Sequence, residues 1–264
     1  MKRFFDNIKR NYKYMNYSAV SELKTEVASS ILGWVWWILE PLCFMLIYVF
    51  IAQVIFNSSE PFFEVFVFTA LLVWNFFSKN LVTSVKLVKA NSDIVTKVYI
   101  AKYILLLNKM IVNFFKLLIS LGLVFVFMII FSVPFHFSIL YILIHLAVLF
   151  IVTFGCSVIM MHFGVFIEDL SNVTNIILKL VFYLSGIFFS IPHRIGASHP
   201  MWGEILLYLN PAAFLINESR NALIYNTPPT WLFTGVWLVV GLCLSAIGIA
   251  LVHKYENTYV KVMK

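Results

Sequence analysis

Charged residues are scarce in this sequence: Asp, Glu, Lys and Arg make up only 12% of its 264 residues. A soluble domain contains about 25% charged and about 45–50% apolar residues, whereas 62% of this chain is hydrophobic. The polar residues occur in short blocks between long apolar runs, so the sequence leaves no stretch for a separate soluble domain. This composition excludes an ordinary water-soluble protein and predicts a single membrane domain.

Motifs that would carry chemistry are also missing. There is no G-x-x-x-x-G-K-[ST] phosphate loop, so we do not expect this chain to bind and hydrolyse ATP in that way. The sequence has no GxGxxG or G-x-S-x-G motif and no Cys or His grouping with metal-ligand spacing. Its three cysteines lie inside apolar runs, where they behave as small hydrophobic residues. We predict no catalytic residue, no metal site and no cofactor bound by this chain, and therefore not an enzyme.

Six apolar segments are expected to cross a bilayer as α-helices. They are residues 33–56, 62–85, 103–131, 138–166, 173–191 and 231–252. A hydrocarbon core of about 30 Å needs about 20 residues at a rise of about 1.5 Å each. The predicted fold class is therefore all-α, a polytopic membrane protein with six transmembrane helices.

Two further segments do not fit a simple span. Residues 192–230 mix Pro, Gly, His and Asn with apolar pieces too short to cross, and we predict a short re-entrant hairpin on the outer side. In residues 1–32, apolar side chains recur every three or four positions among many basic ones, which predicts an amphipathic helix lying in an anionic membrane surface. Residues 33–264 then form the six-span domain.

The basic residues indicate the orientation. Residues 1–32 contain six Lys and Arg, residues 86–102 four and the C-terminal tail three, whereas the opposite loops contain only Arg194 and Arg220. Because cytoplasmic loops carry the excess of Lys and Arg, both termini are predicted in the cytoplasm. This placement accounts for most of the net charge of +7 without a nucleic-acid partner.

Ionisable residues inside spans are costly and point to function. Lys109 and Lys116 lie seven residues apart, on one face of the third span. Lys109 is near enough to the inner end to snorkel. Lys116 is deeper, and three interpretations are open for it: contact with an anionic substrate group, pairing with Glu40, or packing at a subunit seam. Lys79 and Lys179 are interpreted as snorkelling.

Several short motifs also carry a resemblance to a known family. They are SILGWVWWILEPL at residues 30–42, LVWNFFS at residues 72–78, Asn91 with Lys97-Val98-Tyr99, and Asn210-Pro211 followed by Arg220. In this order and spacing they resemble the permease subunit of ATP-binding-cassette exporters that move lipid-linked polysaccharides, including O-antigen, capsule and teichoic acid. The sequence departs from the usual pattern at residues 100–102, Ile-Ala-Lys in place of Phe-Pro-Arg, which leaves the substrate branch open.

The resemblance implies a multi-pass protein of the bacterial cytoplasmic membrane, a homodimer joined to two copies of a cytosolic ATPase subunit. That partner would use ATP and Mg²⁺, the substrate would be a lipid-linked polysaccharide, and membrane lipids would surround the chain. Residues 86–102 form the predicted inner coupling segment, in which Asn91 and Asp93 are expected to cap a short helix. The predicted motor-coupling residues are Asn91, Asp93, Lys97, Glu168 and Asp169.

The candidate substrate-pathway residues come from the first three spans: Trp34, Trp37, Glu40, Trp74, Asn75 and Lys116. The outer hairpin contributes Asn210, Pro211 and Arg220. Two alternatives are weighed against a glycan exporter. One is an ABC permease for drugs or free lipids, and the other is an intramembrane transferase acting on a lipid carrier, which would need polar catalytic residues converging in a pocket.

Overall fold

The computed structural model of the chain describes residues 2–51, 60–97 and 100–262. All regular structure in these ranges is helical, without a strand. Five helical segments are long and apolar enough to cross a membrane: Gly33–Phe50, Phe63–Ala90, Lys102–Ile130, Phe137–Phe166 and Trp231–Tyr259. The predicted all-α, polytopic membrane fold is confirmed.

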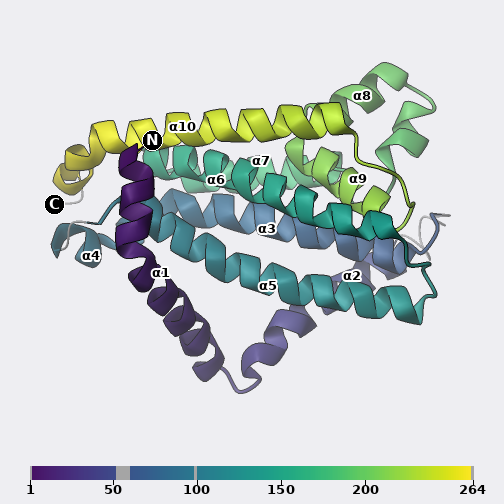
Figure 1. Ribbon diagram of the computed structural model, residues 1–264, viewed down its shortest axis with the longest axis horizontal. Coiled ribbons are helices and arrows are strands. Elements are labelled where there is room, and N and C mark those ends of the chain that lie inside the picture. The colour runs from purple at the N-terminus through teal and green to yellow at the C-terminus, as the bar shows by residue number, and fades with distance from the viewer. Residues whose placement is uncertain (1, 52–59, 98–99, 263–264) are drawn as a thin grey trace.

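Four long helices form the body of the molecule: α3 (Phe63–Ala90), α5 (Lys102–Ile130), α6 (Ile142–Phe166) and α10 (Trp231–Val262). Figure 1 shows them running side by side, with α6 packed against both α3 and α10. Helix α3 is buried along most of its length because α2, α5, α6, α7 and α9 all pack on it. Its mostly apolar surface is compatible with such a central position.

Small residues allow the close packing of α6. A Cβ atom at Gly164 would lie 2.0 Å from the carbonyl oxygen of Val85, so α3 and α6 touch backbone to backbone there. On the other side, a Cβ at Gly155 would lie 2.9 Å from the carbonyl oxygen of Gly241 in α10. Gly241 and Gly248 pack on α6 within the same chain.

Two predicted spans differ from the observed helices. The first consists of a short 3-10 turn, η1 (Gly33–Val35), and α2 (Trp36–Phe50), and its predicted end falls in residues 52–59, outside the described residues. The fifth corresponds to α7 (Leu170–Leu184), which has 15 residues. At about 1.5 Å per residue α7 covers about 22 Å, less than a full hydrocarbon core. The chain leaves the helix after α7 and turns at Gly186, where φ is 65°.

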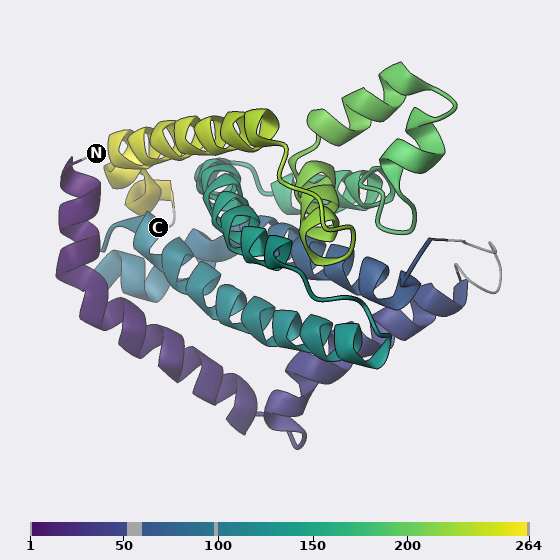
Figure 2. The ribbon, with the colours of Figure 1, turned by 45° about the vertical axis from the view of Figure 1, so that its right-hand side comes forward.

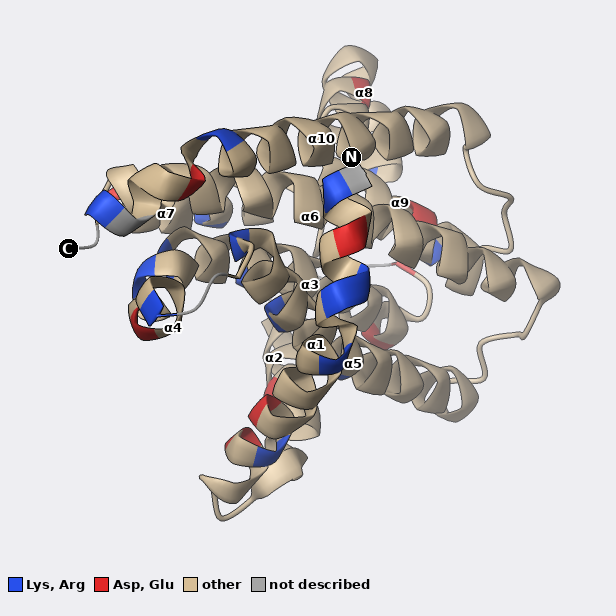
Figure 3. Cartoon of the chain, turned by 60° about the vertical axis from the view of Figure 1, so that its left-hand side comes forward, with Lys and Arg blue, Asp and Glu red and all other residues tan. Residues whose placement is uncertain are grey.

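The predicted amphipathic helix is α1 (Lys2–Ala28), which forms a V with α2 (Figure 2). Met15 and Ala19 bury their side chains against the bundle, whereas Tyr12, from the same predicted apolar face, is 59% exposed. Lys and Arg lie along the outer side of α1, as Figure 3 shows. Helix α1 thus packs against protein over only part of its apolar face, and its placement in a membrane surface stays a prediction.

The two ends of the bundle differ in content. The N-terminus, the C-terminus and α4 (Ser92–Lys97) lie together at one end (Figure 1). The other end carries a one-turn π-helix, η4 (Pro192–Gly196), with α8 (Pro200–Tyr208) and α9 (Pro211–Leu223). Helices α8 and α9 have 9 and 13 residues, too few to cross. The predicted hairpin is therefore a pair of short helices, and its re-entry into the membrane stays a prediction.

Candidate functional site

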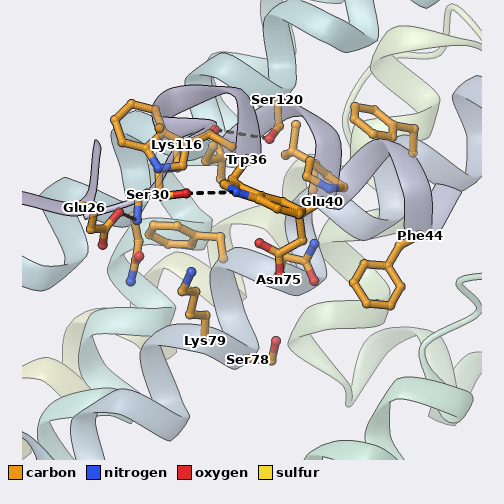
Figure 4. Close-up of a pocket in the computed structure, with 18 residues that line it drawn as sticks. Glu26, Ser30, Trp36, Glu40, Phe44, Asn75, Ser78, Lys79, Lys116 and Ser120 are labelled. Atoms are coloured by element: carbon orange, nitrogen blue, oxygen red, sulfur yellow. Dashed lines mark hydrogen bonds and ion pairs between the residues drawn. The ribbon is translucent and has the colours of Figure 1, made fainter. Parts of the chain in front are cut away.

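A cavity of about 410 Å³ opens between the end of α1, α2 and the facing sides of α3 and α5 (Figure 4). Polar side chains from all of these segments converge on it. They are Glu26, Ser30, Glu40, Asn75, Ser78, Lys79, Asn113, Lys116 and Ser120. Such a concentration of polar groups in an otherwise apolar membrane domain is the strongest candidate for a substrate site.

Helix α3 contributes a polar strip to this cavity. Asn75 and Lys79 are four residues apart, and both are exposed although most of α3 is buried. The neighbouring Asn80 faces α5 instead, where its Oδ1 accepts a hydrogen bond of 2.8 Å from Nδ2 of Asn113. The amide of Asn113 is thus held at the cavity wall, and the ammonium of Lys79 is left facing the opening.

Helix α1 supplies carboxylates to the two lysines of α5. Nζ of Lys116 donates to Oε2 of Glu26, and Nζ of Lys109 donates to Oε1 of Glu22. Glu22 and Glu26 reach the lysines because they lie four residues apart, on one face of α1, where it crosses α5. Of the three interpretations left open for Lys116, pairing with Glu40 is not observed, since its ion-pair partner is Glu26, and Lys109 is paired where snorkelling was expected.

The predicted substrate-pathway residues divide into two groups. Trp37, Glu40, Asn75 and Lys116 line the cavity. Trp34 and Trp74 are absent from its lining: Trp34 is 57% exposed in η1, and Trp74 is buried against Phe182 of α7 with 5.5 Å between ring centroids. One residue along a helix turns the side chain by about 100°. Asn75 therefore faces the cavity while Trp74 faces α7.

The end of the bundle that holds both termini (Figure 1) gathers the predicted motor-coupling residues. Helix α4 projects there, with Val95 buried and Asp93 and Lys97 exposed. The predicted short helix is present, but the Asn91 side chain does not cap it as expected. Its Nδ2 donates to the carbonyl oxygen of Leu87, 2.8 Å away in α3, and its backbone carbonyl accepts from Ile94 and Val95 in α4.

The turn between α6 and α7 lies at the same end. Oε1 of Glu168 is 3.6 Å from Nζ of Lys89, the last basic residue of α3, and the Glu168 side chain is 89% exposed. The backbone carbonyl of Asp169 accepts from Asn172 and Val173 to start α7. The five predicted coupling residues are thus brought to one end of the bundle, where a protein outside the membrane could reach them.

The motif residues of the outer hairpin have structural contacts. Oδ1 of Asn210 accepts from the backbone of Ala212 and Ala213 and caps α9, while Pro211 occupies its first turn. Nδ2 of Asn210 donates to Oγ of Ser185, 2.9 Å away, after α7. Arg220 is buried and donates to three backbone carbonyls. These residues hold α9 against the rest of the bundle.

No protein-family model matches this sequence. The chain is similar to the O-antigen export system permease protein RfbA of Klebsiella pneumoniae, with 25% identity over 246 residues that cover 92% of each chain. It is similar to the protein of the same name from Myxococcus xanthus, with 25% identity over 78% of this chain and 77% of the relative. The chain resembles O-antigen export permeases along most of its length. The resemblance predicted from the short motifs is confirmed.

The permease-like chain also contains site residues that the sequence did not reveal. Lys79 was interpreted as snorkelling, although its spacing from Asn75 was a usable signal. Glu26 was assigned only to a surface helix, and nothing in the sequence shows that this helix folds back on α5. Glu218 was missed as well: it is buried, and its carboxylate accepts from the backbone N–H of Thr230 at 2.8 Å, which joins α9 to the start of α10.

Proposed function

We propose that this chain is the transmembrane subunit of an ATP-driven exporter that moves a lipid-linked polysaccharide across the bacterial cytoplasmic membrane. The observation that carries this proposal is the similarity to O-antigen export permeases over 92% of both chains. An alignment that covers both chains so completely supports a shared role for the whole chain. O-antigen is the glycan in the relatives' names, while teichoic acid and capsule stay open as substrates of this chain.

The chemistry of the cavity supports an anionic substrate head group. Lys79 and Lys116 offer ammonium groups inside a membrane domain. Charged side chains within spans are energetically costly, so their presence there points to a functional role. A lipid-linked glycan carries phosphate next to the lipid, and charge-assisted hydrogen bonds from ammonium to phosphate are among the stronger ones. Trp36 and Trp37 add aromatic surface beside these groups.

The inner end supports a separate motor. The chain carries no phosphate loop, so ATP hydrolysis would come from a cytosolic partner in two copies, one for each chain of a homodimer. Helix α4 and the Glu168-Asp169 turn offer an exposed, charged surface at the end that holds both termini. With this end in the cytoplasm, motion of the partner would reach the cavity through α3 and α5.

Reconstitution tests this proposal. The chain and its ATPase partner are reconstituted in vesicles so that the cytoplasmic side of the protein faces outward. A lipid-linked glycan is then supplied in the outer leaflet, which in this orientation corresponds to the cytoplasmic leaflet of the cell membrane. We expect ATP-dependent movement of the glycan, with none when the ATPase is omitted or carries an inactive phosphate loop. Transport that persists without the ATPase would refute the proposal.

The competing function of a drug or free-lipid permease predicts a different stimulation pattern. We expect a lipid-linked glycan to raise the ATPase rate of the complex, with little response to free lipid or to an amphiphilic drug. The reverse pattern would favour the competing permease. Glycan transfer by the purified chain alone would instead favour a transferase.

A further inference from the structure

The environment of Lys116 calls for an anionic partner. Its side chain is only 16% exposed, and it lies in the middle of α5, a candidate span. An ammonium group in such a place is costly unless a counter-charge accompanies it. In the structure Glu26 of α1 provides that counter-charge, and the ring of Trp37 lies 5.6 Å from the Lys116 nitrogen.

Only one of the two ion pairs between α1 and α5 opens to the cavity. Glu26 and Lys116 line it, whereas Glu22 and Lys109 do not. The lining as a whole carries two lysines, Lys79 and Lys116, and two glutamates, Glu26 and Glu40. With Glu26 in place these formal charges cancel, and without it the cavity has an excess of one positive charge. The affinity of the cavity for an anion therefore depends on the position of α1.

The end of α1 is held mainly by polar contacts. Among residues 20–28 no side chain is buried, and the polar contacts with α5 are the two ion pairs and, one turn earlier, a hydrogen bond of 3.0 Å from Asn108 to Ser18. The first half of α1 is anchored differently, through buried Met15 and Ala19. A segment with few buried apolar contacts opens at low free-energy cost. Gly33, with φ of 50°, follows as a point where the chain can turn.

We propose that Glu26 is an internal counter-ion that closes the cavity to anions, and that the phosphate of a polyprenyl-phosphate lipid head group replaces it on Lys116 when the end of α1 leaves α5. The substrate class in this statement rests on the proposed function. Anion binding to Lys116 and release of α1 are thermodynamically linked. An anion that replaces Glu26 on Lys116 weakens the binding of α1 to α5, and displacement of α1 strengthens anion binding by the same factor.

Binding of farnesyl pyrophosphate to the full-length chain in lipid nanodiscs tests this exchange. Since allosteric coupling is typically about 5–150-fold, we expect Glu26→Gln to bind the probe about tenfold more tightly than the wild type. Lys116→Gln should bind it at least about tenfold more weakly. Glu22→Gln is the matched control, because it loosens the same two helices but leaves the Glu26 carboxylate in the cavity, so its gain in affinity should be clearly smaller than that of Glu26→Gln. Equal effects of Glu26→Gln and Glu22→Gln, or weaker binding by Glu26→Gln, would overturn the proposal.

Two further arms identify the source of the phosphate. Farnesol lacks the anion and should show no dependence on Glu26. Inorganic pyrophosphate lacks the lipid and should bind far more weakly than farnesyl pyrophosphate. Equal affinity of the two pyrophosphates would show a site for free phosphate and would refute the assignment to a lipid head group.

A measurement on the wild-type chain covers the case in which a variant does not fold. Hydrogen exchange of residues 18–28 should speed up when farnesyl pyrophosphate is added, and should be unchanged with farnesol. Unchanged exchange with both would reject the displacement of α1. Glycan export by the reconstituted complex is measured separately. If export is intact but the binding and hydrogen-exchange results fail, only this inference is rejected. If those results hold but ATPase-dependent export is absent, only the proposed function is rejected.

Discussion

Arg220 lies against the ring of Phe66, with its guanidinium carbon 3.3 Å from the ring centroid and its Nε donating to the Phe66 carbonyl oxygen 3.1 Å away. The other two guanidinium nitrogens donate to the carbonyl oxygens of Gly186 and Ile187, each at 2.8 Å. One buried side chain therefore joins α9 to α3 and to the turn after α7. The planar fork of arginine allows this, because its donors point in fixed directions.

Loss of Arg220 should destabilise the end of the bundle formed by α8, α9 and the turn after α7. Arg220→Ala leaves three backbone carbonyls without their donor, at about 1–3 kcal/mol for each buried group left unsatisfied. We expect the free energy of unfolding to fall by at least about 3 kcal/mol, measured by thermal or denaturant unfolding in detergent. Arg220→Lys should recover only part of the loss, because an ammonium group cannot reach all three carbonyls in that geometry.

Arg194→Ala is the control for this change. Arg194 lies in the same hairpin but is exposed, so its removal should alter stability by no more than about 0.5 kcal/mol. Similar unfolding curves for the two alanine variants would contradict the anchoring role of Arg220.

The close crossing of α3 and α6 gives a second prediction. Gly164→Ala would place a methyl group 2.0 Å from the carbonyl oxygen of Val85, and backbone on both sides would have to move. We expect a loss of about 3 kcal/mol or more, within the range for severe overpacking. Gly122→Ala is its counterpart in α5, where a Cβ meets nothing within 4 Å. That variant should be neutral or more stable by about 0.5–1 kcal/mol, because alanine favours helix. The ranking of the two midpoints in a thermal scan is the measurement, and equal midpoints would rule out the close contact.

Much of the architecture could be read from hydropathy, and the exceptions have physical causes. The start of the last span at Trp231 and the end of the fourth at Phe166 agree with the helices, because long apolar runs bounded by polar residues leave few choices. Helix α7 is shorter than expected because Gly186 turns the chain before the apolar run ends. The hydropathy of that run gives no sign of the turn.

The candidate site was less predictable, because it depends on tertiary contacts. Asn75 and Lys116 were singled out as polar groups in apolar spans, and both line the cavity. Glu40, in a neighbouring span, was one of three open interpretations for Lys116, and Glu26 was not considered, because it reaches Lys116 only through the V between α1 and α2. The angle of that V is set by packing of α1 on α5, which leaves no periodic signal in the sequence.

Both termini lie at the same end of the helix bundle (Figure 1), which gives a prediction about membrane topology. In a chain whose three native cysteines are replaced, single cysteines are introduced at Lys9, Lys254 or Arg194, all exposed. A membrane-impermeant thiol reagent should label the first two only in inverted vesicles and the third only in right-side-out vesicles. Labelling of Lys9→Cys and Lys254→Cys from opposite sides would contradict both the bundle and the predicted orientation.

Helix α4 is expected to contact the motor subunit. Asp93→Ala and Lys97→Ala remove exposed charges, so the stability of the chain should change by less than about 0.5 kcal/mol. If α4 forms part of the contact, the double variant should bind the ATPase subunit at least about fivefold more weakly, which corresponds to about 1 kcal/mol. Lys24→Ala, also exposed but on α1, should bind the ATPase like the wild type. Equal affinities of all three proteins in a co-purification or surface-binding titration would exclude α4 as a contact.

Lys79 is the cavity lysine that forms no ion pair among the described residues, so its ammonium is available to a substrate phosphate. Lys79→Gln keeps a hydrogen-bond donor on a side chain of similar size but removes the charge. A hydrogen bond to a charged group is worth about 1.5–3 kcal/mol, so the lipid-linked glycan concentration for half-maximal ATPase stimulation should rise about tenfold or more. Lys79→Arg should retain most of the response, because the charge remains. Lys179→Gln is the matched control, since Lys179 is exposed on α7 but absent from the cavity lining. If phosphate binds in the cavity, only Lys79→Gln should raise the glycan concentration for half-maximal stimulation. Equal increases for Lys79→Gln and Lys179→Gln would show that the charge acts through the overall electrostatic field and would contradict a site at Lys79.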